Sequence, residues 1–396
     1  MIELFPFFII LFVGVFFSEI FSRLHLPWVI ALIVGGIIVG PSGLGVFEPN
    51  TTIEFLGQVG LVFLMFMAGL ETKFSSFREI EKTAFPLVFL NAGIPFLVGV
   101  AITFSFGYGL STALLIGVIF MSSSIAVVIP ALQSAGFLGS RVGHTIVTTT
   151  IIEDVASLVL FSILLQKADP VTSLPLPAFY ALAVLVLLIL RFLVPKIRFF
   201  FTYTDEEKAK DVFQQELRSI FVIMIGTVVM FEVLGFHPII AGFFAGFILS
   251  DSVKSRLLKD RLQAISYGVF IPVFFVLVGT RTDIGVLFSL TSIALLAFVL
   301  SFGSITSKFF SGWLGARLEG FSKQESFLVG VSTIPQLSTT LAVAFSGVEL
   351  GLIDQELASA IVVLSIVTTL ISPLLIKWVS GKVVVTPEGH VIESKL

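Results

Sequence analysis

Two adjacent acidic residues, Glu153 and Asp154, lie in the middle of an apolar stretch that runs from Ile146 to Leu160. Such a stretch is typical of a membrane-spanning helix, where a carboxylate is costly and is rarely kept without a function. Carboxylate oxygens bind hard cations such as Na⁺ and K⁺, and they also carry protons. The pair therefore indicates a place inside the membrane where a monovalent cation, a proton or both are bound.

Hydroxyl groups accompany the two acids on the same predicted helix. Thr149, Thr150 and Ser157 lie three or four residues from one acid or the other, which places them on the same helical side. The acids are about a dozen residues from either end of the predicted span 142–166, and at ~1.5 Å per residue they lie ~17 Å deep, near the bilayer midplane. The alternative is a buried acidic pair that only satisfies neighbouring polar groups.

Lys308 is the other charged residue that is isolated within an apolar stretch. A lysine this far from both ends of a span must pair with an acid or lose its proton. Glu153 and Asp154 are the available intramembrane partners, and we predict that Glu153 takes this role. The alternative is a lysine whose long side chain extends to the membrane surface.

The composition requires a membrane protein. The 396 residues are 56% hydrophobic and 12% charged, whereas a soluble domain carries about 25% charged residues. The absence of cysteine excludes disulfides and thiolate metal sites, and the four histidines show no ligand spacing. We therefore predict an all-α polytopic membrane protein with no cofactor and no nucleic-acid partner.

Apolar runs long enough to cross about 30 Å of hydrocarbon predict thirteen spans. They cover residues 2–22, 27–45, 52–70, 83–106, 110–134, 142–166, 175–199, 216–235, 237–250, 264–280, 286–314, 323–348 and 355–379. All but four of the 23 lysines and arginines fall in odd-numbered loops or the C-terminal tail, the exceptions being Lys167, Arg191, Arg281 and Lys308. Since basic residues favour the cytoplasmic side, the N-terminus is predicted outside and the C-terminus in the cytoplasm.

Two polar clusters interrupt predicted spans that are seven apart in the order of spans. The first contains Ser122, Ser123 and Ser124, and the second contains Thr333, Pro335 and Gln336. Matched interruptions of this kind are the best sequence indication of a transporter site between inverted repeats. The alternative is that the hydroxyls bond back to their own helices.

These clusters define the predicted domain organisation. A transmembrane domain covers residues 1–380, with repeat 1 at about 1–170, a linker helix at about 175–215 and repeat 2 at about 216–380. The two six-helix repeats would each contain one broken helix, and the two broken helices would cross. A short cytoplasmic tail covers residues 381–396.

The residues permit an exchange mechanism. A buried carboxylate prefers its protonated form, whereas a bound metal cation requires the charged form, so proton and cation compete for Asp154. If the empty, charged site crosses the membrane poorly, movement of one ion is coupled to return of the other. The pair of Glu153 and Lys308 would either stabilise the core or carry a second proton.

Five stretches have distinctive sequences: Leu26–Gly45, Leu56–Leu61, Phe66–Glu71, Ser122–Val128 and Phe270–Gly279. They resemble stretches of the monovalent cation:proton antiporters of the second type, which include Kef-like and Nap-like members. The resemblance covers essentially the whole chain. It implies Na⁺ (or Li⁺) or K⁺ exchange for protons in a bacterial or archaeal plasma membrane, and a homodimer with a core domain, a dimerisation domain and elevator-type alternating access.

The resemblance also implies roles for single residues. Asp154 falls where the family has its ion-binding aspartate, and Lys308 falls where the family has a basic residue in its core. Position 153 departs from the family pattern, because members commonly have Asp there with electrogenic exchange, or Gln or Asn with electroneutral exchange. Glu153 keeps the charge and therefore favours electrogenic exchange.

Three other functions fit the sequence less well. A sodium-coupled organic-anion symporter shares related crossed-helix architecture, but it would need a wide cavity with a cationic or aromatic lining. A cation channel would need a selectivity filter, and no Gly-Tyr-Gly sequence of that type is present. An intramembrane hydrolase would need a Ser/His or metal constellation, whereas the buried acids here accompany a lysine. We therefore predict a transporter and not an enzyme.

Overall fold

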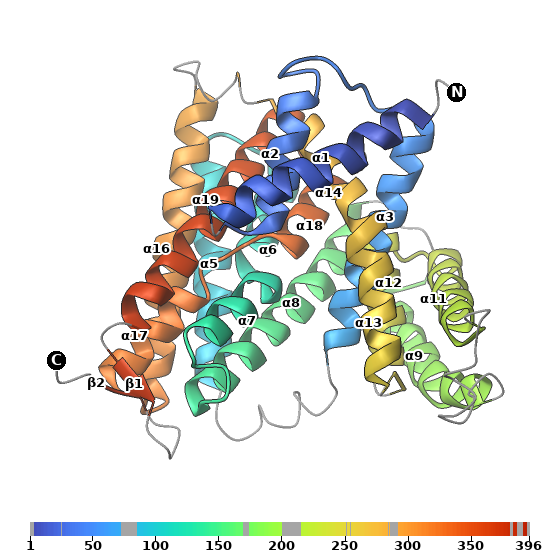
Figure 1. The fold of residues 1–396 in the computed structure, drawn as a ribbon. Helices are drawn as coiled ribbons and strands as arrows, with labels where there is room; N and C mark the ends of the chain where they lie inside the picture. Colours follow the sequence, from blue (N-terminus) through green and yellow to red (C-terminus); the bar gives the residue numbers. More distant parts are fainter. Residues whose placement is uncertain are drawn as a thin grey trace. The chain divides into compact units, whose positions relative to one another are not determined.

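The computed structural model describes most of the chain, and the described part is helical apart from one pair of strands (Figure 1). The described residues are 4–24, 26–72, 85–168, 174–199, 215–250, 252–253, 255–283, 285, 292–380, 383–385 and 391–393. The start of the predicted span 286–314 and the charged end of the predicted linker, residues 200–214, lie outside the described residues.

The helices alternate with short connections along the whole described chain. They are α1 (Leu4–Arg23), α2 (Trp28–Val39), α3 (Thr51–Glu71), α5 (Phe85–Ser105), α6 (Leu110–Met121), α7 (Ile125–Ser134), α8 (Arg141–Ala168), α9 (Leu176–Phe199), α11 (Gln215–Val233), α12 (Pro238–Leu249), α13 (Arg256–Ile265), α14 (Ile271–Thr280), α16 (Ser292–Leu318), α17 (Lys323–Ser332), α18 (Ser338–Glu349) and α19 (Gln355–Ser380). Strands β1 (Val383–Val385) and β2 (Val391–Glu393) pair antiparallel, with Val384 opposite Ile392.

The fold is that of an all-helical membrane protein with several spans. Within the described ranges, nine helical segments are long and apolar enough to cross a membrane, and α2 and α12 are shorter apolar helices. Each of the thirteen predicted spans contains helical residues in the structure. The described helices therefore agree with the predicted all-α class.

One predicted loop is helical. Arg256, Lys259 and Arg261 were expected in the connection after span 237–250, but they belong to α13. The hydroxyl of Ser255 accepts the backbone N–H of Leu258 at 3.5 Å, so this serine caps α13, which begins eight residues before the predicted span. A π-helical turn at Ser266–Phe270 then joins α13 to α14.

The contacts divide the chain into two compact units. Unit 1 comprises Met1–Leu11, Pro49–Ser75 and Leu165–Phe275, and unit 2 comprises Phe12–Glu48, Ser76–Leu164 and Val276–Leu396. Each unit is therefore assembled from segments that are far apart in the sequence.

Glycines bring α3 and α12 together within unit 1. A Cβ added at Gly69 would lie 2.1 Å from the carbonyl oxygen of Phe243, and one added at Gly246 would lie 2.0 Å from that of Phe66. Both distances are shorter than any allowed contact. The two backbones therefore touch at positions where only glycine fits, as expected for close helix packing in a membrane.

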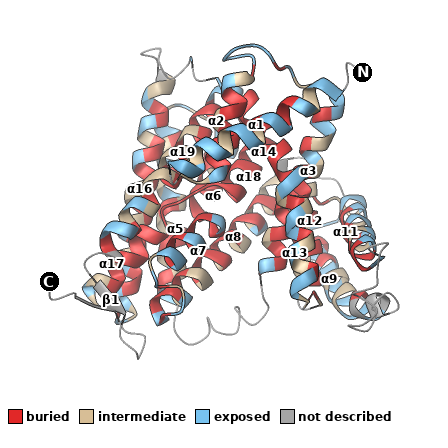
Figure 2. Cartoon of the chain, in the orientation of Figure 1, coloured by how far each residue is buried: buried red, intermediate tan, exposed pale blue. Residues whose placement is uncertain are grey.

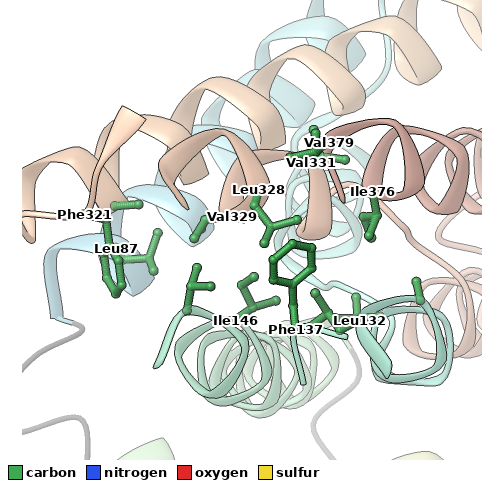
Figure 3. Close-up of a cluster of buried hydrophobic side chains, with 14 residues drawn as sticks. Leu87, Leu132, Phe137, Ile146, Phe321, Leu328, Val329, Val331, Ile376 and Val379 are labelled. Atoms are coloured by element: carbon green, nitrogen blue, oxygen red, sulfur yellow. The ribbon is translucent and has the colours of Figure 1, made fainter. Parts of the chain in front are cut away.

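Unit 2 contains a cluster of buried apolar side chains supplied by α5, α7, α8, α16, α17 and α19 and by the turns beside them (Figure 3). Phe137 and Phe321 contribute the two rings, and Leu132, Ile146 and Leu328 are fully buried among them. Burial extends to α18 of the same unit, in which residues 338–347 are all buried (Figure 2). This packing holds the helices that carry the polar residues described next.

Candidate ion-binding site

Two helices of unit 2 are interrupted, and their interruptions contact each other. Between α6 and α7, Ser122 and Ser124 have extended backbones, with ψ angles of 153° and 107°. Residues 333–337 separate α17 from α18, where Pro335 lacks the N–H that a continuous helix requires. The backbone N–H of Ser124 donates to the carbonyl oxygen of Pro335 at 2.7 Å, so each interruption supplies a partner to the other.

Side chains add three more bonds between the interruptions. The hydroxyls of Ser122 and Thr340 lie 2.9 Å apart. Gln336 Nε2 donates to the carbonyl oxygen of Phe120 at 3.0 Å, and Ser123 Oγ lies 2.9 Å from the carbonyl oxygen of Thr333. These bonds replace partners that the backbone loses where a helix stops inside the membrane.

The structure pairs Glu153 with Lys308. Both side chains are fully buried, and Lys308 Nζ lies 2.9 Å from Glu153 Oε2. The ammonium also donates to the carbonyl oxygens of Asn91 and Met121, so all three of its protons have acceptors. Met121 is the last residue of α6, and the C-terminal end of a helix favours a cation. The lysine therefore does not extend to the membrane surface.

Asn91 completes the surroundings of this ion pair and was not identified from the sequence. Its Nδ2 donates to Glu153 Oε1 at 2.7 Å, and Ser123 Oγ lies 2.9 Å from Glu153 Oε2. Glu153 thus faces two N–H donors, Asn91 and Lys308, and the Ser123 hydroxyl, whose one proton is shared with the carbonyl oxygen of Thr333. An uncharged polar residue in the apolar run of α5 was the signal that could have indicated Asn91.

Asp154 has a different environment. Its side chain is 6% exposed, and within the described part of the chain its Oδ1 has no hydrogen-bond partner. The hydroxyl of Thr339 and the backbone N–H of Ser123 face the carboxyl group. Thr339 is in the first turn of α18, where the helix dipole favours an anion. Asp154 is therefore held beside both interruptions with one oxygen available to another ligand.

The other hydroxyls predicted on α8 have separate environments. Thr149 and Thr150 are fully buried, and their hydroxyls have no hydrogen-bond partner among the described residues. Ser157 donates to the carbonyl oxygen of Asp154 at 2.8 Å and so bonds to its own helix. The hydroxyl of Ser124 is also buried without a partner among the described residues. Several oxygen atoms on or beside α8 thus remain available.

Comparison with known proteins supplies a family for this arrangement. Residues 7–382 match the family described as sodium/hydrogen exchanger, transmembrane. The chain is 31% identical over 381 residues to the probable Na⁺/H⁺ antiporter 3 of Methanocaldococcus jannaschii, covering 94% of this chain and 95% of that protein. It is 26% identical to the Na⁺/H⁺-K⁺ antiporter GerN of Bacillus cereus, covering 92% of each.

A solved structure shows a similar fold. The sodium proton antiporter MjNhaP1 of Methanocaldococcus jannaschii, at pH 8, superposes with a TM-score of 0.66. The match has 18% sequence identity and covers 94% of this chain and 96% of that one. At this identity the similarity concerns the fold alone.

Proposed function

The chain belongs to the sodium/hydrogen exchanger family, and we propose that it exchanges Na⁺ (or Li⁺) or K⁺ for protons by alternating access, with Asp154 as the exchanging carboxylate. The family is one of transporters, so the protein is not an enzyme. Antiport of Na⁺ or K⁺ is supported by relatives that are named as Na⁺/H⁺ and Na⁺/H⁺-K⁺ antiporters.

The observation that carries the proposal is the difference between the two adjacent carboxyl groups. Glu153 accepts from the Asn91 amide and from a fully bonded ammonium, and the Ser123 hydroxyl lies within bonding distance of it. Asp154 is almost as deeply buried, yet its Oδ1 has no partner among the described residues. A free carboxylate oxygen in a buried polar site is a ligand for a hard cation or a position for a proton. Ion exchange therefore falls to Asp154.

The two ions exclude each other at this oxygen. A proton on Asp154 removes the negative charge that a cation needs, and a bound cation keeps the carboxylate charged. Without either ion, Asp154 would carry a buried, uncompensated charge, because Lys308 is already paired with Glu153. The empty site therefore crosses the membrane poorly, and transport of one ion requires return of the other.

The finer assignment follows from the sequence pattern. We propose a type-2 member with thirteen spans, in which α6–α7 and α17–α18 are equivalent broken helices of two inverted repeats. The bonds between the two interruptions support this arrangement. Electrogenic exchange follows from the charge kept at Glu153, and the homodimer and the external N-terminus are part of the same proposal.

The test is exchange by purified protein in sealed proteoliposomes under a pH gradient, with Na⁺, Li⁺ and K⁺ offered in turn. We expect exchange with at least one cation, dependence of the rate on a clamped membrane potential, and loss of exchange to the rate of empty vesicles in Asp154→Asn. Thr103→Val is the matched control, because Thr103 is buried and its hydroxyl bonds to the carbonyl oxygen of Gly99 in its own helix. Exchange by Asp154→Asn at the wild-type rate would contradict the proposal.

A further inference from the structure

Asn91 contacts both members of the buried ion pair. Its side-chain Nδ2 donates to Glu153 Oε1 at 2.7 Å, and its backbone carbonyl accepts from Lys308 Nζ at 3.2 Å. Asn91 is itself fully buried in α5. A single residue thus fixes the acid from α8 and the base from α16 relative to a third helix.

The orientation of the Asn91 amide follows from its neighbours. Glu153 faces it with an oxygen that accepts, so the NH₂ group must point toward Glu153. The amide oxygen faces two hydroxyls, Ser311 Oγ at 2.7 Å and Thr333 Oγ1 at 3.5 Å, and each hydroxyl also lies within bonding distance of a carbonyl oxygen of its own helix. The reversed amide would place an oxygen against the Glu153 carboxylate. Donors and acceptors therefore allow one orientation of this side chain.

The packing around Asn91 leaves the amide little room to turn away. A Cβ added at Gly312 of α16 would lie 2.8 Å from Thr333 Oγ1 and 3.3 Å from Asn91 Oδ1. The helix that carries Lys308 thus approaches Asn91 at a glycine. This close approach keeps the amide between Ser311 and Glu153.

We infer that Asn91 is a positioning residue that keeps Glu153 bonded to Lys308, so that Asp154 and not Glu153 exchanges the ions. The inference rests on the proposed exchange at Asp154. Without the Asn91 amide, Glu153 Oε1 loses its donor, and the carboxylate is no longer held against Lys308. A displaced Glu153 balances Lys308 less well, and the ammonium charge then acts on Asp154 and opposes binding of the cation.

Few other titratable groups can affect this pH dependence. The acids on α8 are Glu153 and Asp154, and the base on α16 at this level is Lys308. Helices α6 and α7 carry no titratable side chain. The charged residues of α17, α18 and α19, together with those at the ends of α8 and α16, lie in or near the terminal turns of their helices: Arg141, His144, Lys167, Arg317, Lys323, Glu325, Glu349, Glu356 and Lys377.

The experiment measures the rate of exchange against pH and cation concentration for Asn91→Ala, Asn91→Asp and Ser311→Ala in the full chain. In Asn91→Ala we expect the apparent KM for the cation to rise about ten-fold, because a ten-fold change corresponds to the loss of about one hydrogen bond to a charged group. The same positive charge opposes protonation of Asp154, so the acid limb of the pH profile should move about one unit toward acid pH. The nearly isosteric Asn91→Asp should move the limb the opposite way, toward neutral pH, because it adds a negative charge beside the two acids.

Ser311→Ala keeps every charge and should move the pH profile in the same direction as Asn91→Ala, but by less. Thr103→Val on the same helix should keep the wild-type profile. Wild-type KM and pH profile in the Asn91 variants would overturn the inference, even if their yield or thermal stability were reduced. If neither Asn91 variant could be purified, an unchanged profile in Ser311→Ala would overturn it. Absence of exchange in the wild type would instead contradict the proposed function.

Discussion

Unit 1 and unit 2 hold their helices together in opposite ways. Unit 1 does so at the contact between α3 and α12, and unit 2 does so at the two joined interruptions. In unit 1, complete helices approach backbone to backbone because glycines at Gly69 and Gly246 leave room. In unit 2, α6 and α17 stop inside the protein, and side chains satisfy the free backbone groups. The contact in unit 1 depends only on steric fit, whereas the contact in unit 2 brings charged and hydroxyl side chains together. The difference separates a region suited to holding helices from a region suited to binding ions.

Removal of the base from the buried pair should have the largest effect on stability. In Lys308→Met the Glu153 carboxylate stays buried without its partner, which should cost about 3–5 kcal/mol of unfolding free energy. Glu153→Gln combined with Lys308→Met removes both charges and should recover part of that loss. Thermal unfolding of the purified variants in one detergent measures both. Equal stability of Lys308→Met and the double variant would contradict the expected recovery.

A methyl group in the glycine contact of unit 1 should have the next largest effect. In Gly246→Ala the new Cβ would lie 2.0 Å from the carbonyl oxygen of Phe66, so the helices must separate. Overpacking of this kind costs about 1–3 kcal/mol. Gly226→Ala is the control, because a Cβ there meets no atom within 4 Å, and the change should be neutral or stabilising by less than about 1 kcal/mol.

The rate of exchange by Gly246→Ala also tests whether the glycine contact of unit 1 is separate from the ion site of unit 2. Gly246→Ala should lower thermal stability and leave the pH profile of the remaining exchange unchanged, because no charge is altered. A shifted pH profile in Gly246→Ala would mean that the glycine contact also tunes the ion site. The distinction between a holding region and a binding region would then fail.

The hydroxyl pair that joins the interruptions should have the smallest effect. Ser122 and Thr340 lie 2.9 Å apart, and one such bond inside a membrane protein is worth about 0.6 kcal/mol on average. Ser122→Ala and Thr340→Val should therefore each destabilise slightly, and the double variant should cost less than the sum. Thermal unfolding of the four proteins in a double-mutant cycle measures the coupling. Strictly additive effects would show that the hydroxyls do not interact.

The main elements of the site could be predicted because charge and helix breakers are costly in a membrane. Glu153, Asp154 and Lys308 stand out in apolar stretches, and the interruptions stand out through three consecutive serines and Pro335. Each of these residues violates the pattern of a spanning helix by itself. Their positions along the chain therefore indicated where the unusual backbone and the buried charges lie.

The remaining members of the site depend on tertiary packing. A single Asn91 in α5 carries no charge, and its importance comes from the approach of α16 at Gly312. Ser311 could not be distinguished from other serines of α16, since its contact with Asn91 depends on helix rotation. The helical start of α13 was missed for another reason, because its basic residues resemble a cytoplasmic loop. Sequence periodicity does not specify which faces meet.

The apparent KM for the transported cation, measured against pH, tests the competition at Asp154 most directly. The measurement uses wild-type proteoliposomes with the same pH on both sides, a fixed membrane potential and saturating as well as limiting cation. If proton and cation compete for one carboxylate, the KM should rise about ten-fold for each unit of pH below the protonation of the site, while the rate at saturating cation stays nearly constant. A KM that is independent of pH, with a maximal rate that falls in acid, would contradict the account.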